Sequence, residues 1–151
     1  MDKIDLVISH LSQVAAVSGT VIVCLYTAKA PPANCAPMLR EPTPKSSVYL
    51  DSQFPRLMGR EISKNTSIHD GAVMFGRPSR RRRYRVTGWS FRLFPPPASI
   101  ISEPNRGSAF NSCLAMSVTP MVDRTYLVGA TELFRFQHGQ TFLLQPILSR
   151  P

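Results

Sequence analysis

ELFRFQHGQTFLLQ, residues 132–145, is the stretch from which we predict the fold. Two runs rich in Phe, Leu and Thr flank the dipeptide His138-Gly139. A two-residue loop that ends in Gly supplies the positive φ required by a tight turn between antiparallel strands. The pattern therefore predicts a β-hairpin over Leu133–Gln145.

The segments before this hairpin favour more short strands. In Tyr84–Phe94, the residues Trp89, Phe91 and Leu93 recur at every second position, as they would on the core face of one strand. Further strands are predicted over residues 47–50, 72–75, 112–119 and 126–136, with a tight turn at Asp70-Gly71 and at most one helical turn within Phe54–Lys64. The chain has 14 prolines, which disfavour long helices. We therefore predict a mainly β fold, a small antiparallel sandwich or barrel with a short N-terminal helix.

The first thirty residues admit three interpretations. Leu6–Ala28 carries no formal charge and is long enough to be a membrane segment. Its apolar residues also fit one face of a short amphipathic helix that ends at Ser18-Gly19, followed by a buried strand over Val21–Thr27. A signal peptide is the third interpretation, although Pro31 follows its cleavage-like sequence.

Composition suggests a boundary after this segment. Residues 30–45 hold five prolines in sixteen positions, which is typical of an extended linker. We therefore divide the chain into an N-terminal apolar segment (residues 1–29), a Pro-rich linker (30–45) and a basic β-rich domain (46–151).

Positive charge is concentrated in one place. The formal net charge is +9, yet residues 71–102 contain seven arginines and no acidic residue, so the remainder carries only two excess charges. Arg binds phosphate through planar, bidentate contacts, and clusters of Arg bind nucleic acid by releasing counterions. We predict phosphate contacts from six arginines, and stacking on a base from the tyrosine among them. These candidate residues are Arg77, Arg80, Arg81, Arg82, Arg83, Tyr84 and Arg85.

Nothing in the sequence points to an enzyme, a metal site or a cofactor. The usual nucleophile, zinc-protease and phosphate-loop motifs are absent, and the acidic residues are scattered. His69 and Asp70 could form a catalytic acid–base pair, but we interpret them as part of a loop before the Asp70-Gly71 turn. Three cysteines without a CxxC spacing favour a reducing compartment.

These observations predict a non-enzymatic nucleic-acid-binding protein, nuclear or cytoplasmic, whose partner is RNA, DNA or another polyanion. In plan, a small β-rich body with an arginine cluster is similar to viral coat, matrix and silencing-suppressor proteins, which implies a viral structural or accessory role. The arginine run also fits a nuclear-import signal read by an acidic importin-type receptor. The alternative is a membrane-associated accessory protein, anchored by residues 6–28, with the arginines against an anionic membrane.

Overall fold

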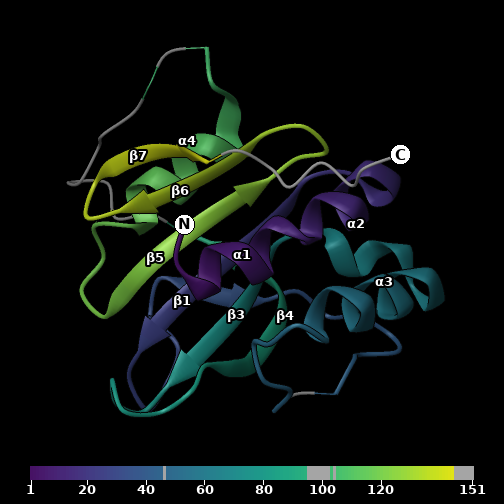
Figure 1. Cartoon of the computed structure of the whole chain (residues 1–151). Helices are drawn as coiled ribbons and strands as arrows, with labels where there is room; N and C mark the ends of the chain where they lie inside the picture. Colours follow the sequence, from purple (N-terminus) through teal and green to yellow (C-terminus); the bar gives the residue numbers. More distant parts are fainter. Residues whose placement is uncertain (46, 95–102, 104, 145–151) are drawn as a thin grey trace.

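A computed structural model describes residues 1–45, 47–94, 103 and 105–144 (Figure 1). The described part contains four α-helices and one short 3₁₀-helix, with these bounds: α1 Lys3–Ser9, α2 Leu11–Ser18, α3 Phe54–Lys64, η1 Thr66–His69 and α4 Gly107–Met116. It also contains seven strands: β1 Val21–Thr27, β2 Cys35–Pro37, β3 Ala72–Arg77, β4 Arg85–Leu93, β5 Val122–Val128, β6 Leu133–Gln137 and β7 Gln140–Leu144.

All seven strands form one open sheet in the order β2-β4-β3-β1-β5-β6-β7. β1 and β3 are parallel, and the other neighbouring pairs are antiparallel. Among the residues that the structure describes, strand and helix are nearly equal, at 32% and 30%. The fold is therefore mixed α/β with one open sheet and no closed barrel, so the predicted mainly β fold is confirmed only in part. The parallel pair requires a crossover, and the chain supplies it with β2 and α3 between β1 and β3.

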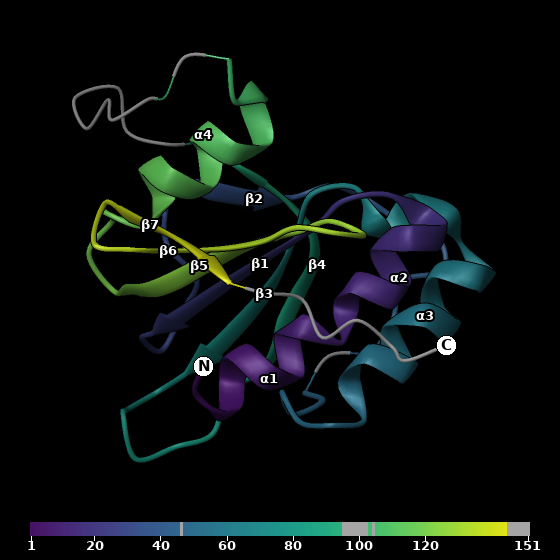
Figure 2. The same cartoon turned by 45° about the horizontal axis from the view of Figure 1, so that its top comes forward.

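Helices cover both faces of the sheet (Figure 2). α1, α2 and α3 pack on one face, where Leu11 and Phe54 join the same core as Val23 of β1. α4 packs on the other face, where Phe110 contacts the rings of Phe134 and Phe136 at centroid distances of 5.3 and 4.8 Å. The three layers account for the apolar central strands, because a sheet covered on both faces buries both sides of its middle strands.

β1 shows this double burial most clearly. Val21, Val23 and Leu25 face the α1–α3 core, whereas Cys24 and Tyr26 belong to the core of the opposite face. Both sets are almost fully buried. A continuous apolar run of this kind is what a central strand requires.

The N-terminal residues form helices and then a strand, as the amphipathic interpretation predicted. α1 begins with a capping box, in which Asp2 and Asp5 each accept a hydrogen bond from the other's backbone N–H. α2 ends before Gly19, whose φ is 99°. None of the helices in the described ranges combines the length and the apolar character needed to cross a membrane. Residues of α1, α2 and β1 share one core with residues of β3 to β6.

Several predicted strands are confirmed. The hairpin pairs Leu133 with Leu144 through a turn in which His138 and Gly139 both have positive φ, 50° and 77°. Its last predicted residue, Gln145, lies outside the described residues. β3 and β4 also form, and Trp89 and Phe91 are buried as predicted. The prediction that the two rings share one face is wrong: Trp89 and Phe91 belong to opposite cores, because Ser90 has a φ of 55° where the register of β4 against β3 shifts.

Other predicted strands were wrong. Most of residues 112–119 lies in or directly after α4, where Phe110, Cys113 and Leu114 are buried at helical spacing. The segment 126–136 is the end of β5, a turn and the start of β6. Residues 47–50 contribute only a bridge between Tyr49 and Arg85, and Ser47 interrupts extended backbone with a φ of 72°. Phe54–Lys64 is a full helix of 11 residues.

Candidate nucleic-acid interface

The predicted arginines lie on and around the loop between β3 and β4. We call residues 78–83 the arginine loop. A backbone hydrogen bond from the N–H of Arg82 to the carbonyl of Ser79, 3.0 Å long, shapes the turn at its tip. Pro78 fixes φ where the chain leaves β3. The loop extends from the lower left of the molecule in Figure 1, away from the four α-helices.

The three arginines at the tip are exposed. Arg80, Arg81 and Arg82 point away from the core, and within the described part of the chain none of them forms an ion pair. Three adjacent guanidinium groups repel one another in water, so an anionic partner would relieve an existing strain. They form a cationic surface that no acidic side chain of the described residues neutralises through an ion pair.

Tyr49 provides an aromatic ring beside this surface. The guanidinium of Arg83 lies 4.1 Å from the centre of the Tyr49 ring, and that of Arg85 lies 5.7 Å away. The guanidinium of Arg83 also lies 3.6 Å from the carboxylate of Asp51. Both side chains of this ion pair are exposed to solvent. Tyr49 is 38% exposed, so part of its ring remains accessible.

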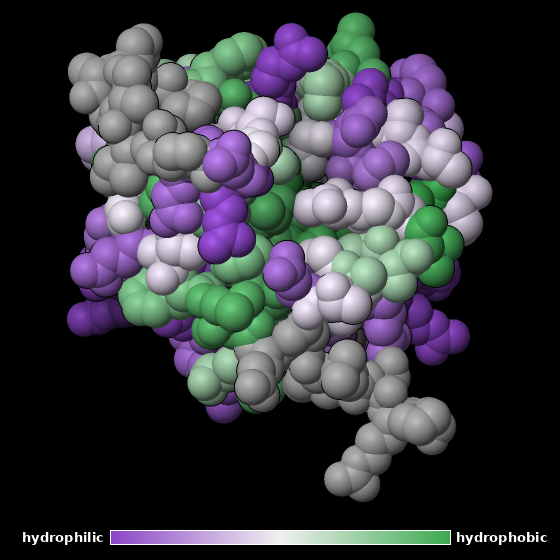
Figure 3. Space-filling model, turned by 90° about the horizontal axis from the view of Figure 1, so that it is seen from above, coloured by the Kyte–Doolittle hydropathy of each residue, from purple (hydrophilic) through white to green (hydrophobic). Residues whose placement is uncertain are grey.

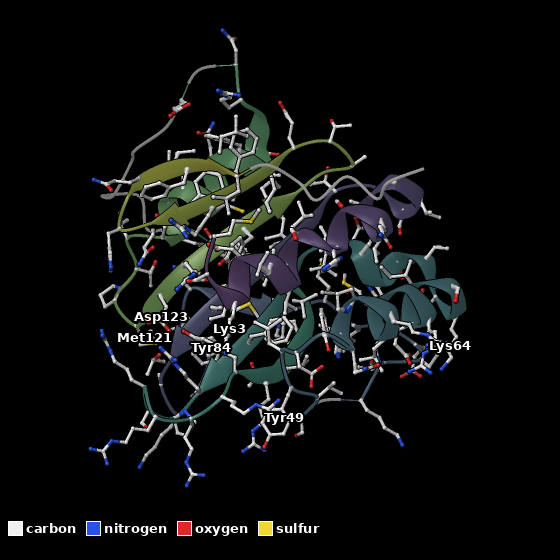
Figure 4. The ribbon with its side chains drawn as sticks, viewed as in Figure 1. Lys3, Tyr49, Lys64, Tyr84, Met121 and Asp123 are labelled. Carbon is white, nitrogen blue, oxygen red and sulfur yellow. The ribbon has the colours of Figure 1, made fainter. Side chains whose placement is uncertain are left out.

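The two ends of the loop are held together by Asp123 of β5. Tyr84 donates a hydrogen bond to Asp123, and Thr27 does the same at 2.6 Å. Arg77 lies 3.8 Å from the same carboxylate, with its guanidinium 4.2 Å above the Tyr84 ring. Figure 4 shows Tyr84 and Asp123 together above the loop, from which nitrogen-tipped side chains extend. We call Arg77, Tyr84, Thr27 and Asp123 the clamp.

The clamp changes the role of two predicted contacts. Tyr84 is only 6% exposed, so its ring offers little surface for a base. Burial raises the pKa of Tyr84, and the hydrogen bond to Asp123 raises it further, so the hydroxyl stays protonated. Arg77 is largely buried, and its charge is paired with the carboxylate of Asp123. The exposed candidates are thus Arg80, Arg81, Arg82, Arg83 and Arg85.

Sequence reasoning missed Tyr49 and Asp123. Tyr49 was placed in a short strand before the basic run, and only the bridge between Tyr49 and Arg85 brings it beside the arginines. Asp123 comes from β5, which meets the loop because β5 pairs with β1. A local pattern contains no signal for either contact, because both depend on strand order.

A second candidate region is a polar cavity of about 390 Å³ near α4, on the opposite face of the sheet from α1–α3. Asp70, Arg92, Ser108 and Ser112 provide its charges and hydroxyls, and Phe91 belongs to its apolar wall. Figure 3 looks down from the top of Figure 1 and shows apolar and polar patches side by side on the surface that it displays. A cavity of this size and mixed character is typical of a small-molecule site.

The turn at Asp70-Gly71 forms one edge of this cavity. Gly71 has a φ of 78°, and a Cβ atom there would lie 2.8 Å from the backbone oxygen of Phe91. Only glycine therefore fits, which confirms the predicted turn. His69 and Asp70 line different cavities, and 3.9 Å separates the His69 Nε2 from the nearer Asp70 carboxylate oxygen. His69 instead places its Nδ1 2.5 Å from the Thr66 carbonyl.

Thiol and metal chemistry find little support in the described residues. Cys24 and Cys113 are buried, and burial raises the pKa of the Cys113 thiol to about 12. All three cysteines are free. In the ranges that the structure describes, no three His, Cys, Asp or Glu side chains come together as a metal site would require.

Comparisons with known proteins identify the fold. No family model and no curated protein matches the sequence. A hypothetical membrane spanning protein from Bacillus cereus has a similar structure, with a TM-score of 0.66 and 12% identity over 96% of this chain. The chain spans 64% of the length of that structure. DacA from Staphylococcus aureus, as the N166C/T172C double mutant, is similar with a TM-score of 0.56 and 13% identity over 92% of this chain and 85% of that one. The chain therefore shares its fold with these two bacterial proteins.

Proposed function

We propose that this protein binds nucleic acid through the arginine loop and the neighbouring Tyr49. The observation that carries the proposal is the exposed tip, where Arg80, Arg81 and Arg82 have no ion-pair partner in the described part of the chain. Arg83 and Arg85 extend the positive surface towards Tyr49. Phosphates would contact the guanidinium groups, and an unpaired base would stack on the Tyr49 ring.

A tyrosine ring beside a row of phosphate-binding arginines predicts a preference for single-stranded nucleic acid. Duplex bases stack on one another and leave no free face for Tyr49, whereas an unpaired base can rotate onto an aromatic ring. The arginines carry no sequence information, because phosphates are the same at every position. We therefore expect affinity that depends strongly on salt and weakly on sequence.

The test is fluorescence anisotropy with labelled 20-nucleotide single strands and the matching duplex, each over a range of salt concentrations. Replacing Arg80, Arg81 and Arg82 by Gln should weaken binding to every sequence alike. It should also lower the slope of log affinity against log salt by about 2 to 3, from roughly 0.7–0.9 per lost phosphate contact.

The matched control removes three charges elsewhere. Arg56, Arg60 and Lys64 lie exposed on α3, distant from the loop in Figure 1. The triple Gln variant at these positions has the same net charge as the loop variant and should keep most of the affinity. If both variants lose the same affinity, binding depends on the net charge of the protein and not on the position of the arginine loop. Binding to anionic lipid vesicles, without binding to nucleic acid, would replace the proposal by the membrane alternative.

A second candidate function belongs to the polar cavity beside α4. Arg92 and the hydroxyls of Ser108 and Ser112 suit phosphate. We therefore also propose a nucleotide or a similar phosphorylated small molecule as a ligand. Isothermal titration with nucleoside triphosphates tests this, and Arg92→Gln should weaken binding about tenfold. An unchanged affinity in Arg92→Gln would exclude the cavity as the site.

A further inference from the structure

A third cavity adjoins the arginine loop and has a different composition. It has a volume of about 430 Å³ and lies where β1 and β3 end and β4 begins. Because β1 and β3 are parallel and β4 is antiparallel to β3, basic residues at these strand ends meet at one edge of the sheet. Lys29, Arg77 and Arg85 line the cavity, and none of the described residues in its lining is acidic.

The three basic side chains differ in how firmly they are held. The Arg77 Nε donates to the Thr27 hydroxyl at 2.9 Å, and its guanidinium lies 3.8 Å from Asp123, so its position is fixed by the clamp. Lys29 and Arg85 are exposed and form no ion pair with any residue that the structure describes. The cavity therefore offers two uncompensated positive charges beside a third that is already paired.

The lining of the cavity also includes uncharged residues that contact one another. Tyr26 donates a hydrogen bond of 2.8 Å to the Thr87 hydroxyl, and its ring occupies the space beside Gly76. A Cβ atom at Gly76 would lie 2.5 Å from this ring, so glycine is what admits Tyr26. Because Tyr26 and Thr87 are hydrogen-bonded to each other, an anionic ligand in this cavity would pair with the charges of Lys29 and Arg85.

We propose that this cavity binds a phosphate monoester, namely the terminal phosphate of a nucleic-acid strand that lies on the arginine loop. The inference rests on the proposed function and adds an end preference to it. A monoester carries nearly two negative charges at neutral pH, whereas an internal phosphate carries one. Two free cations in one cavity therefore favour the strand end. Arg85 connects the two regions, because it lines the cavity and also lies beside Tyr49.

The experiment compares two strands of equal sequence, each labelled at the 3′ end, with either a phosphate or a hydroxyl at the 5′ end. In the unmodified protein, the 5′-phosphate should raise the affinity about tenfold. Lys29→Gln should abolish this difference while keeping the affinity for the 5′-hydroxyl strand. Lys64→Gln, an equal loss of charge on α3, should preserve the difference. The loop triple variant should weaken both strands alike.

Two results separate this inference from the proposed function. Equal affinity for both strands in the unmodified protein overturns the inference and leaves nucleic-acid binding intact. If neither strand binds, the proposed function fails, and titration with a nucleoside 5′-monophosphate then decides the inference. Chemical-shift changes at the amides of Lys29 and Gly76 that disappear in Lys29→Gln would establish a site for free phosphate monoesters. Unchanged shifts at both amides would overturn it.

Discussion

Arginine serves opposite purposes in two regions of this molecule. Arg124 of β5 and Arg135 of β6 lie against Asp5 of α1, whose side chain is fully buried. Arg80, Arg81 and Arg82 of the arginine loop face solvent. In the first region every charge has a partner of opposite sign within the fold, whereas in the second the partners would have to come from outside. The same side chain is structural or available for binding according to where its counter-charge lies.

The buried region is centred on one carboxylate, that of Asp5. Asp5 accepts hydrogen bonds of 2.7 Å from both Arg135 and the hydroxyl of Tyr126, and Arg124 lies 3.5 Å away. The Nε atoms of Arg124 and Arg135 are buried without a partner among the described residues. Removing the Asp5 charge would therefore leave two guanidinium groups without their central partner, although Asp2 still contacts Arg124 at 2.7 Å.

The largest expected effect is the loss of this carboxylate. Asp5→Asn should lower the free energy of unfolding by about 3–5 kcal/mol, because it leaves positive charge poorly compensated in the interior. Urea denaturation measures it. The control is Asp51→Asn, which removes the exposed partner of Arg83 and should cost under about 1 kcal/mol. If both variants lose a similar free energy of unfolding, the buried and exposed arginines do not differ in their contribution to stability.

The clamp lies between these extremes, since it is partly buried and supports the loop. Tyr84→Phe removes the hydrogen bond to Asp123 and keeps the ring under Arg77. We expect the free energy of unfolding to fall by about 1.5–3 kcal/mol, as for a hydrogen bond to a charged acceptor. Hydrogen exchange should show faster opening at the ends of the arginine loop. Unchanged exchange there would mean that the clamp does not hold the loop.

Acid should weaken the buried region through Asp2. Partial burial raises the pKa of Asp2, but the backbone N–H of Asp5 and the guanidinium of Arg124 outweigh this effect and hold the pKa below its usual 3.8. A lowered folded-state pKa stabilises the fold above pH 3.8, and this stabilisation disappears as the pH falls through the folded-state pKa. Asp2→Asn should therefore flatten the loss of stability below about pH 4, measured by urea denaturation. An identical pH profile in the variant would contradict this assignment.

The smallest expected effect belongs to the loop itself. Replacing Arg80, Arg81 and Arg82 by Gln should change the free energy of unfolding by no more than about 0.5 kcal/mol, because exposed side chains without partners contribute little. The same denaturation experiment measures it. A large loss would show that the tip arginines are structural, like Arg124 and Arg135.

Local patterns sufficed for some elements and failed for others. The hairpin from Leu133 was predictable because its turn demands positive φ at two adjacent residues. β1 was predictable as a buried strand from its unbroken apolar run. α4 lies where residues 112–119 predict a strand, because Cys113, Leu114, Ala115 and Met116 form a continuous buried run and Phe110, which completes the helical spacing, precedes that segment. Burial on both faces of the sheet removes the alternation on which such predictions depend.

The candidate site divides in the same way. The charge of the arginine loop was visible as composition, because the charge of Arg is independent of its surroundings. The sequence did not show which arginines are free to bind a ligand and which contact other residues of the protein. Arg77 turns inward to Asp123 and Arg83 turns to Tyr49, and both partners are distant in sequence. Tyr84 was expected to stack on a base and is buried instead.

By itself, the sequence determined where positive charge accumulates, which residues turn at the final hairpin, and that the segment from Val21 to Thr27 is a buried strand. Each of these follows from properties of residues that are adjacent in the chain. Only the tertiary structure decided that β1 lies between β3 and β5, that Tyr49 flanks the loop, and that Lys29 shares a cavity with Arg85. The reason is physical, because strand order and packing bring together residues that no local preference connects.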